Sequence, residues 1–470
     1  MSWPAIHQLA ADVRAGKLKA TDLVEQSLQA IKDKAEYKSI IATLDDAARA
    51  RAAAVDKNPK GRLAGVPFIA KDNFLVFGAE TTAASNILKG FTAPYQSTAI
   101  EKLEAEGAIC VAKANLDAFA HGSSTENSDF FTTLNPHDKT KVPGGSSGGS
   151  AAAVMLDLAP FALGSDTGGS IRLPASFCGA VGLKPTYGLV SRSGVVAMAS
   201  STDVIGPLTR TVEDAALVLD VMAGQDPLDG TTIERQEDYT VQATSLKGKK
   251  VGIIKEYMAD GLQPGVRTQI DKAIQVLKDQ GAEVSEVSLP TLPLGLAVYY
   301  VLCPAEVSSN LSRYDGQRYG FTSADAKDLD ASFKESRSQG FGKEAKRRIM
   351  IGTYVLSSGY YDAYYKKAQI VRTKLINEFK AAFKEHDFLL GPTCATTAFA
   401  VGANSDDPLQ MYLTDIMTVA VNLAGIPAIS IPAGVSSDDQ MPVGLQLMAA
   451  QKQDKELLDF AAALETELPK

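Results

Sequence analysis

The chain has 470 residues, of which 45% are hydrophobic and 22% charged, with a formal net charge of −8 at pH 7. These values are typical of a globular protein with a large buried core. The only basic cluster, Lys343 to Arg348, is too small to hold a nucleic-acid backbone, so the chain by itself is not predicted to bind RNA.

No run of twenty apolar residues occurs, and the first sixteen residues mix charges into their apolar positions. The sequence therefore predicts neither a membrane span nor a signal peptide, and we expect a soluble cytoplasmic protein. The four cysteines are far apart, without a CxxC pair, which favours reduced structural thiols: Cys110, Cys178, Cys303 and Cys394.

Helical periodicity first appears over residues 21–32, where Thr21 is the expected N-cap of the helix. A second helix is predicted to begin after Ser97 and to run through Leu103. The apolar run at 108–113 then predicts a strand.

Further along the chain, short β-rich runs alternate with helical patterns. The polar segment 223–250 is predicted to be a surface excursion, and residues 360–386 are predicted to form a long helix without a catalytic role. We therefore expect one α/β domain, residues 1–470, with a mixed sheet covered by helices on both faces. The later strands are expected at residues 251–255, 387–393, 428–434 and 443–448.

Two glycine-serine clusters, Gly144 to Ser150 and Gly168 to Ser170, lie within the segment 141–174. Glycine in such numbers indicates main-chain amides directed at a negative charge. A phosphate-binding P-loop needs a lysine after its last glycine, and neither cluster has one. A Gly-x-Ser-x-Gly elbow is also missing, because Ile171 and Arg172 follow Ser170.

The remaining interpretation is a serine nucleophile at the end of its own amide cradle. In this interpretation Ser170 is the nucleophile. The amides that would stabilise the oxyanion are those of Thr167, Gly168, Gly169 and Ser170 itself.

A general base must accompany such a nucleophile. Of the four histidines only His121, in the segment AHGSSTENS, supports a Ser-His-Asp alternative. Lys71 is the better candidate, because it ends the apolar run 66–70 and burial would lower its pKa toward about 7 to 8. The sequence equally allows Lys71 to pair with Asp72 at the strand end.

Three residues in their segments resemble the Ser-cisSer-Lys arrangement of the amidase signature family: Lys71 in KDN, Ser146 in GGSSGGS and Ser170 in GSDTGGSIRLP. The resemblance implies the amidase signature fold, with its signature core at about residues 60–220. It makes Ser170 the nucleophile, Ser146 the proton relay after a cis peptide bond, and Lys71 the base.

Longer segments, among them HGSSTENS and SSGYYDAYYKKAQ, resemble the A subunits of bacterial glutamyl-tRNA(Gln) amidotransferases. This resemblance implies a chain that hydrolyses glutamine through a γ-glutamyl ester and supplies ammonia. It implies B and C subunits as partners, with tRNA held by the B subunit. ATP and Mg²⁺ would be used there, and this chain would hold no metal or cofactor.

Glutamine has an α-carboxylate and an α-ammonium group that need partners of opposite charge when buried. The resemblance places these partners at Arg348 and Asp415, with Tyr299 or its neighbour Tyr300 in the pocket and Tyr299 chosen. From the residues alone, the favoured interpretation of Arg348 is a surface cation of a basic helix, beside Lys346 and Arg347.

Three functions stay open at this point. The first is the ammonia-producing subunit, which converts Glu-tRNA(Gln) or Asp-tRNA(Asn) together with its partners. The second is a stand-alone amidase that uses the same Lys71, Ser146 and Ser170 on another carboxamide. The third is a noncatalytic anion-binding module.

Overall fold

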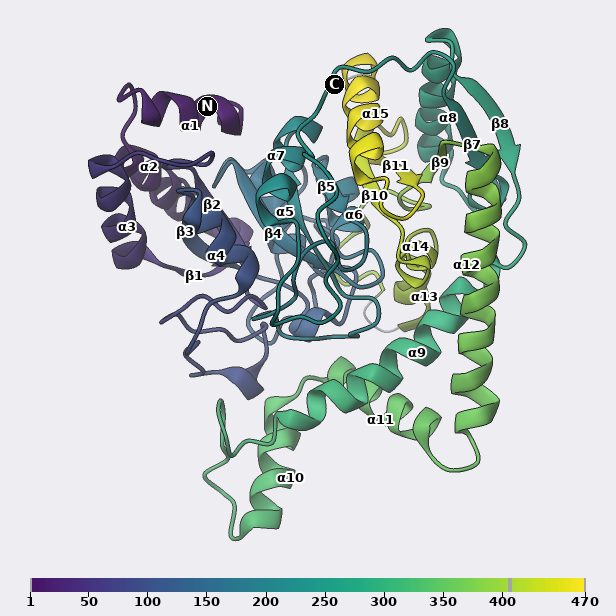
Figure 1. Cartoon of the computed structure of the whole chain (residues 1–470). Coiled ribbons are helices and arrows are strands. Elements are labelled where there is room, and N and C mark those ends of the chain that lie inside the picture. The colour runs from purple at the N-terminus through teal and green to yellow at the C-terminus, as the bar shows by residue number, and fades with distance from the viewer. Residues whose placement is uncertain (1, 405–407, 469–470) are drawn as a thin grey trace.

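The computed structural model describes residues 2–404 and 408–468. Its central feature is one sheet in the order β1-β3-β2-β4-β6-β5-β10-β11-β9-β7-β8 (Figure 1). The strands are β1 (Ile40–Thr43), β2 (Pro67–Lys71), β3 (Ile109–Ala114), β4 (Phe161–Asp166), β5 (Val181–Lys184), β6 (Val204–Thr209), β7 (Lys250–Ile254), β8 (Glu283–Val287), β9 (Phe388–Pro392), β10 (Ala428–Val435) and β11 (Pro442–Ala449).

The sheet is mixed, as predicted. Strand β2 is parallel to both of its neighbours, β3 and β4, and β7 is parallel to β8 and β9, whereas the remaining pairs are antiparallel. Because β2 and β4 run in the same direction, their carboxyl ends, Lys71 and Asp166, meet at one edge of the sheet.

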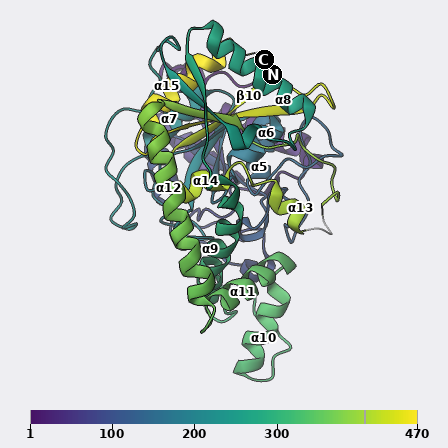
Figure 2. The same ribbon diagram turned by 90° about the vertical axis from the view of Figure 1, so that its right-hand side faces the viewer.

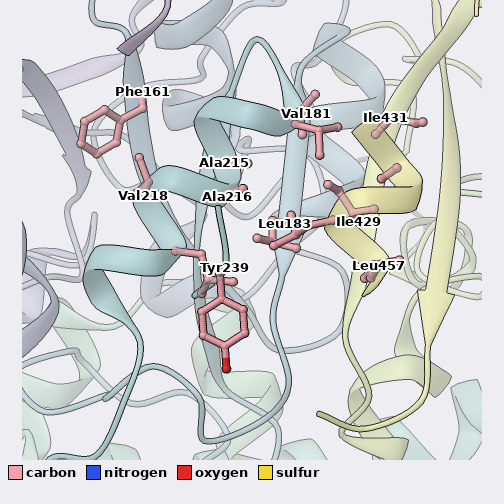
Figure 3. Close-up of a cluster of buried hydrophobic side chains, with 14 of the residues drawn as sticks. Phe161, Val181, Leu183, Ala215, Ala216, Val218, Tyr239, Ile429, Ile431 and Leu457 are labelled. Atoms are coloured by element: carbon pink, nitrogen blue, oxygen red, sulfur yellow. The ribbon is translucent and has the colours of Figure 1, made fainter. Parts of the chain in front are cut away.

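One face of the sheet is covered by a large apolar cluster that includes Phe68 and Ala70 of β2. In Figure 3, side chains of β4, β5 and β10 meet those of α7 and α15 in this cluster. The helices that contribute to it include α1 (Ile6–Arg14), α4 (Thr98–Ala105), α7 (Val212–Met222), α8 (Pro264–Asp279) and α15 (Asp454–Glu467).

Ile69, between Phe68 and Ala70, points to the opposite face, as the two-residue period of a strand requires. The helices here are α2 (Ala20–Asp33), α3 (Asp45–Lys57), α5 (Gly148–Met155), α6 (Arg172–Cys178), α9 (Gly295–Asn310), α12 (Lys367–Glu385) and α14 (Val419–Ala424). An α/β fold with helices on both faces is therefore confirmed.

A helical lobe extends away from the sheet, formed by α10 (Leu329–Gly340), α11 (Lys343–Leu356) and parts of α9 and α12 (Figures 1 and 2). The short helix α13 (Pro408–Leu413) lies nearer the sheet. Among the described residues, the helical run Leu292–Arg313 is the one long and apolar enough to cross a membrane. It packs against α11 and α12 as a core helix.

The predicted cap of α2 is wrong. The helix begins at Ala20, and its first amides are satisfied by a distant carboxylate, Asp56, which lies 2.6 Å from the amide nitrogen of Ala20. Thr21 donates its own hydroxyl to the same carboxylate. The cap predicted at Ser97 is confirmed, since its side chain accepts the amide of Ile100.

Two other segments differ in part from their predicted structure. Residues 360–386 begin with a π-helical turn, Tyr361–Lys366, before α12 starts. The excursion 223–250 contains no helix or strand before β7, but Tyr239 and Leu246 are buried in the core, so it is anchored and not merely a surface loop.

Candidate active site

Lys71 ends a strand whose five residues are all buried, and its own side chain is 0% exposed. Its amine nitrogen lies 2.8 Å from Ser146 Oγ, 2.9 Å from Ser147 Oγ and 2.9 Å from Ser165 Oγ. Burial lowers the pKa of Lys71 to about 7, even though buried aspartates nearby act to raise it. The amine is thus suited to exist uncharged near neutral pH.

Ser146 follows a cis peptide bond from Gly145, as the resemblance implies. The glycines before it are required for close packing, because a Cβ at Gly145 would overlap the carboxylate of Asp117 and one at Gly144 would overlap the backbone of Pro174. These two glycines thus serve packing, and the expectation that the first cluster directs its amides at an anion stays a prediction.

The second cluster is held by a buried ion pair. Asp166 accepts the amides of Gly169 and Ile171 at 2.9 and 3.1 Å, and the guanidinium of Arg172 lies 3.0 Å from its carboxylate. Burial alone would raise the pKa of Asp166, but the charge of Arg172 lowers it to about 2. The turn that carries Ser170 is fixed by this carboxylate.

This arrangement changes the predicted amide cradle. The amide of Gly169 already donates to Asp166. The amides of Thr167, Gly168 and Ser170 have no hydrogen-bond acceptor within residues 2–404 and 408–468, so these three are free to meet an oxyanion. Gly168 has no room for a side chain, because a Cβ there would overlap the ring of Tyr299.

Ser170 is 7% exposed. Its carbonyl accepts the amide of Ser147 at 3.1 Å, which ties the nucleophile candidate to the serines around Lys71. Its hydroxyl has no partner within the described part of the chain, and no hydrogen bond joins it to the hydroxyl of Ser146.

The predicted substrate residues come together. Arg348 is only 2% exposed, so its interpretation as a surface cation is wrong. Its guanidinium lies 5.3 Å from the ring centre of Tyr300, whose hydroxyl donates to Asp415 at 3.1 Å. The hydroxyl of Thr418 links this group to the second cluster, because it donates to the carbonyl of Gly168 at 2.5 Å.

The two neighbouring tyrosines have different places. Tyr300 lies between Arg348 and Asp415, whereas the ring of Tyr299 packs against Gly168 beside the nucleophile turn. A cavity of about 140 Å³ opens at Arg348. Its other lining residues include Ser123, Ser124, Glu126, Glu344 and Tyr412.

Two alternatives from the sequence are not supported. Asp72 pairs with Lys113 at 2.7 Å and not with Lys71. Neither ring nitrogen of His121 has a hydrogen-bond partner within the described residues, so His121 forms no Ser-His-Asp triad. Burial, together with the charge of Arg348, keeps the pKa of His121 well below its usual value.

Several residues of the site were not predicted from the sequence. Ser147 and Ser165 contact Lys71 directly, and Asn73 donates to Ser165 Oγ at 3.0 Å. The sequence did place two of these residues near predicted or conspicuous positions: Asn73 lies two residues after Lys71, and Ser165 directly precedes Asp166. Sequence proximity alone could not show that their side chains turn inward.

Comparisons with known proteins show what this chain resembles. A model of the amidase family matches residues 22–458. A glutamyl-tRNA(Gln) amidotransferase A subunit of Clostridium acetobutylicum is 51% identical over 471 residues, covering 98% of each sequence. The glutamyl-tRNA(Gln) amidotransferase A subunit of Thermotoga maritima has a TM-score of 0.81 at 41% identity, over 96% of this chain and 92% of that one. The peptide amidase of Stenotrophomonas maltophilia has a TM-score of 0.83 at 30% identity, over 98% and 96%.

The Asp166–Arg172 pair gives a stability prediction. Arg172→Met leaves the buried carboxylate without its counter-charge, so the free energy of unfolding should fall by about 3–5 kcal/mol. Adding Asp166→Asn to this variant should recover part of the loss. Denaturant unfolding measures both. As a control, Arg318→Met removes an exposed pair with Asp315 and should change stability by less than about 1 kcal/mol. Wild-type stability of the Arg172→Met variant would contradict this role.

Proposed function

The chain belongs to the amidase family, and we propose that it is the glutamine-hydrolysing subunit of a tRNA-dependent amidotransferase. The observation that carries this proposal is the fully buried amine of Lys71, with a pKa lowered to about 7, within hydrogen-bond distance of Ser146. The similarity to amidotransferase A subunits, which extends over almost the whole chain, supports glutamine as the substrate.

In the proposed acylation step, the hydroxyl of Ser170 attacks the γ-carboxamide carbon of glutamine. Its proton passes to Ser146 as the proton of Ser146 passes to neutral Lys71. Negative charge develops on the carboxamide oxygen, where the amides of Thr167, Gly168 and Ser170 can donate to it. Gly169 contributes by packing and by its bond to Asp166, and not as an oxyanion donor.

The same route then runs in reverse. Protonated Lys71 returns a proton through Ser146 to the leaving nitrogen, and the C–N bond breaks. Ammonia departs, and a γ-glutamyl ester remains on Ser170. Water attacks this ester with Lys71 again as the base, and glutamate is released. A neutral amine is therefore required at the start of both steps.

Glutamine recognition follows from charge. Arg348 is proposed to pair with the α-carboxylate, and Asp415 with the α-ammonium group, while Tyr300 orients Asp415. Burial raises the pKa of Asp415 to about 7 in the free protein, and a bound ammonium group would keep the carboxylate ionised. Tyr299 is proposed to form the wall beside the scissile amide, because it packs on Gly168.

The complex is proposed to contain B and C subunits, with tRNA held by the B subunit in the cytoplasm. ATP and Mg²⁺ are assigned to the B subunit, and no residue of this chain is assigned to either. The acceptor is proposed to be Glu-tRNA(Gln), as the names of the relatives suggest.

Replacing the nucleophile separates the two halves of the reaction. Ser170→Ala should abolish ammonia release from glutamine but leave tRNA amidation from added ammonium intact in the assembled complex, because only the ammonia source is lost. Amidation of tRNA and glutamate release are measured in parallel, with Ser437→Ala, an exposed serine, as the control.

Loss of both activities in Ser170→Ala would make the residue structural. Steady hydrolysis of other amides by the purified chain, without action on glutamine, would instead identify a stand-alone amidase. That second function is favoured only by the similarity to peptide amidase.

The pH dependence of kcat tests whether Lys71 is the general base. Since the neutral amine is the base, kcat for glutamine hydrolysis should rise about tenfold per pH unit below 7 and level off above it. Lys71→Arg, which stays charged, should be inactive at every pH. Asp415 titrates in the same range, so Asp415→Asn serves as the control: it should raise KM and leave the kcat profile in place. A kcat that does not change between pH 5.5 and 7 would remove Lys71 from the mechanism.

A surface for the partner subunits is proposed on the helical lobe. Tyr354, Tyr360 and Tyr364 contact one another, and Met350 lies one turn before Tyr354 on α11. Their exposed fractions are 41–47% for the tyrosines and 72% for Met350. Exposed apolar patches rich in tyrosine are typical of protein interfaces.

Tyr354→Asp should therefore weaken co-purification of this chain with its partner subunits by tenfold or more, because it places a charge in a buried interface. Leu228→Asp changes an exposed leucine outside the lobe and should have no effect. Unchanged assembly of the Tyr354→Asp variant, with wild-type thermal stability, would place the interface elsewhere.

A further inference from the structure

A neutral lysine amine has two N–H bonds and one lone pair. It can act as a base toward Ser146 only when the lone pair faces that hydroxyl and both N–H bonds are directed elsewhere. The amine of Lys71 has two other hydroxyl neighbours, Ser147 and Ser165, each at 2.9 Å. Where their protons go decides the direction of the lone pair.

Ser147 is settled by its own hydrogen bond. Its hydroxyl donates to the carbonyl oxygen of Ser165 at 3.2 Å, so its oxygen is left to accept an N–H bond from Lys71. One of the two N–H bonds is therefore used on Ser147.

Ser165 is the open position. Its hydroxyl oxygen lies 3.0 Å from the side-chain nitrogen (Nδ2) of Asn73 and 2.9 Å from the amine nitrogen of Lys71. With this orientation of Asn73, the lone pair of Lys71 is the one acceptor that the described residues offer to the hydroxyl proton of Ser165, in competition with Ser146. The carboxamide oxygen of Asn73 is also buried without a partner among the described residues, which is costly.

A half-turn of the Asn73 carboxamide resolves the first of these conflicts, because its oxygen and nitrogen have nearly the same size. It moves the NH₂ group to the buried position that the oxygen held. The oxygen then accepts the hydroxyl proton of Ser165, and the oxygen of Ser165 accepts the second N–H bond of Lys71. Asn73 and Ser165 also line a cavity of about 230 Å³.

We propose that Asn73 is a positioning residue for the general base: its carboxamide oxygen holds the proton of Ser165, so that the lone pair of Lys71 faces Ser146. Asn73 thus acts through Ser165 and Lys71 and does not touch the substrate. The inference rests on the proposed role of Lys71 and deepens it.

The test compares Asn73→Ala, Ser165→Ala and the double variant by kcat for glutamine hydrolysis. Asn73→Ala should lose roughly tenfold to a hundredfold, because Ser165 then donates to the lone pair. In the Ser165→Ala background, Asn73→Ala should lower kcat by less than about twofold, since the competing hydroxyl proton of Ser165 is gone. Losses that multiply in the double variant, or an Asn73→Ala variant as fast as the wild type, would overturn the proposal.

The pH profile distinguishes positioning from simple damage. In Asn73→Ala the new hydrogen bond favours the neutral amine, so the rise in kcat should move to lower pH. Asn73→Asp still accepts the Ser165 proton but adds a negative charge, which raises the pKa of Lys71, so activity should recover at higher pH. Profiles that keep the wild-type midpoint in both variants would contradict the proposal, and Asn73→Asp supplies the test if Asn73→Ala does not fold.

Failure of the proposed function gives a different result. If the wild-type chain does not hydrolyse glutamine, or Ser170→Ala still does, the assigned reaction is wrong. The same variants are then compared on whichever amide the wild type does hydrolyse, because the proton count concerns Lys71 and not the substrate.

Discussion

The proposed mechanism depends on one amine buried among hydroxyl groups, with a pKa that burial lowers to about 7. A carboxylate in contact with Lys71 would keep it protonated and unable to accept a proton. Three aspartates lie close enough to influence it, but each is engaged elsewhere: Asp117 by main-chain amides, Asp166 by Arg172, and Asp203 by Thr167. The fold thus surrounds the amine with uncharged hydroxyl groups. Each of the three carboxylates is bound by a partner other than Lys71.

Close packing of two loops provides the positions of the hydroxyls. Strands β2 and β4 are parallel neighbours, so the lysine at the end of one lies beside the turn that follows the other. Glycine at positions 144 and 145 lets the serine loop approach the backbone at Pro174 and the side chain of Asp117, and glycine at 168 lets Tyr299 approach the nucleophile turn. Side chains at these positions would push the loops apart, so the second group of glycines serves both packing and amide exposure.

Much of the fold and part of the site could be predicted from the sequence, because they depend on local pattern. The buried strand ending at Lys71 and the cap at Ser97 follow from neighbouring residues. The cap of α2 could not be predicted, since Asp56 lies more than thirty residues away. The roles of Asp166 and Ser165 were missed for a related reason: their partners lie on other elements, and a hydroxyl reveals its hydrogen-bond direction only beside them.

The proposed substrate pocket and the proposed partner surface lie on different sides of one helix, α11. Arg348 is on its buried side, and Tyr354 is exposed six residues later. Gly352 lies so close to the carbonyl of Pro304 in α9 that no side chain could fit between them. Helix α9 also carries Tyr300, which contacts both Arg348 and Asp415, so the two helices pack closely beside these two charged residues. A partner that moves α11 must move Arg348 relative to Asp415 or shift both helices together, and either change alters how a charged amino acid fits. Docking on the lobe would therefore act on the proposed glutamine site through α11.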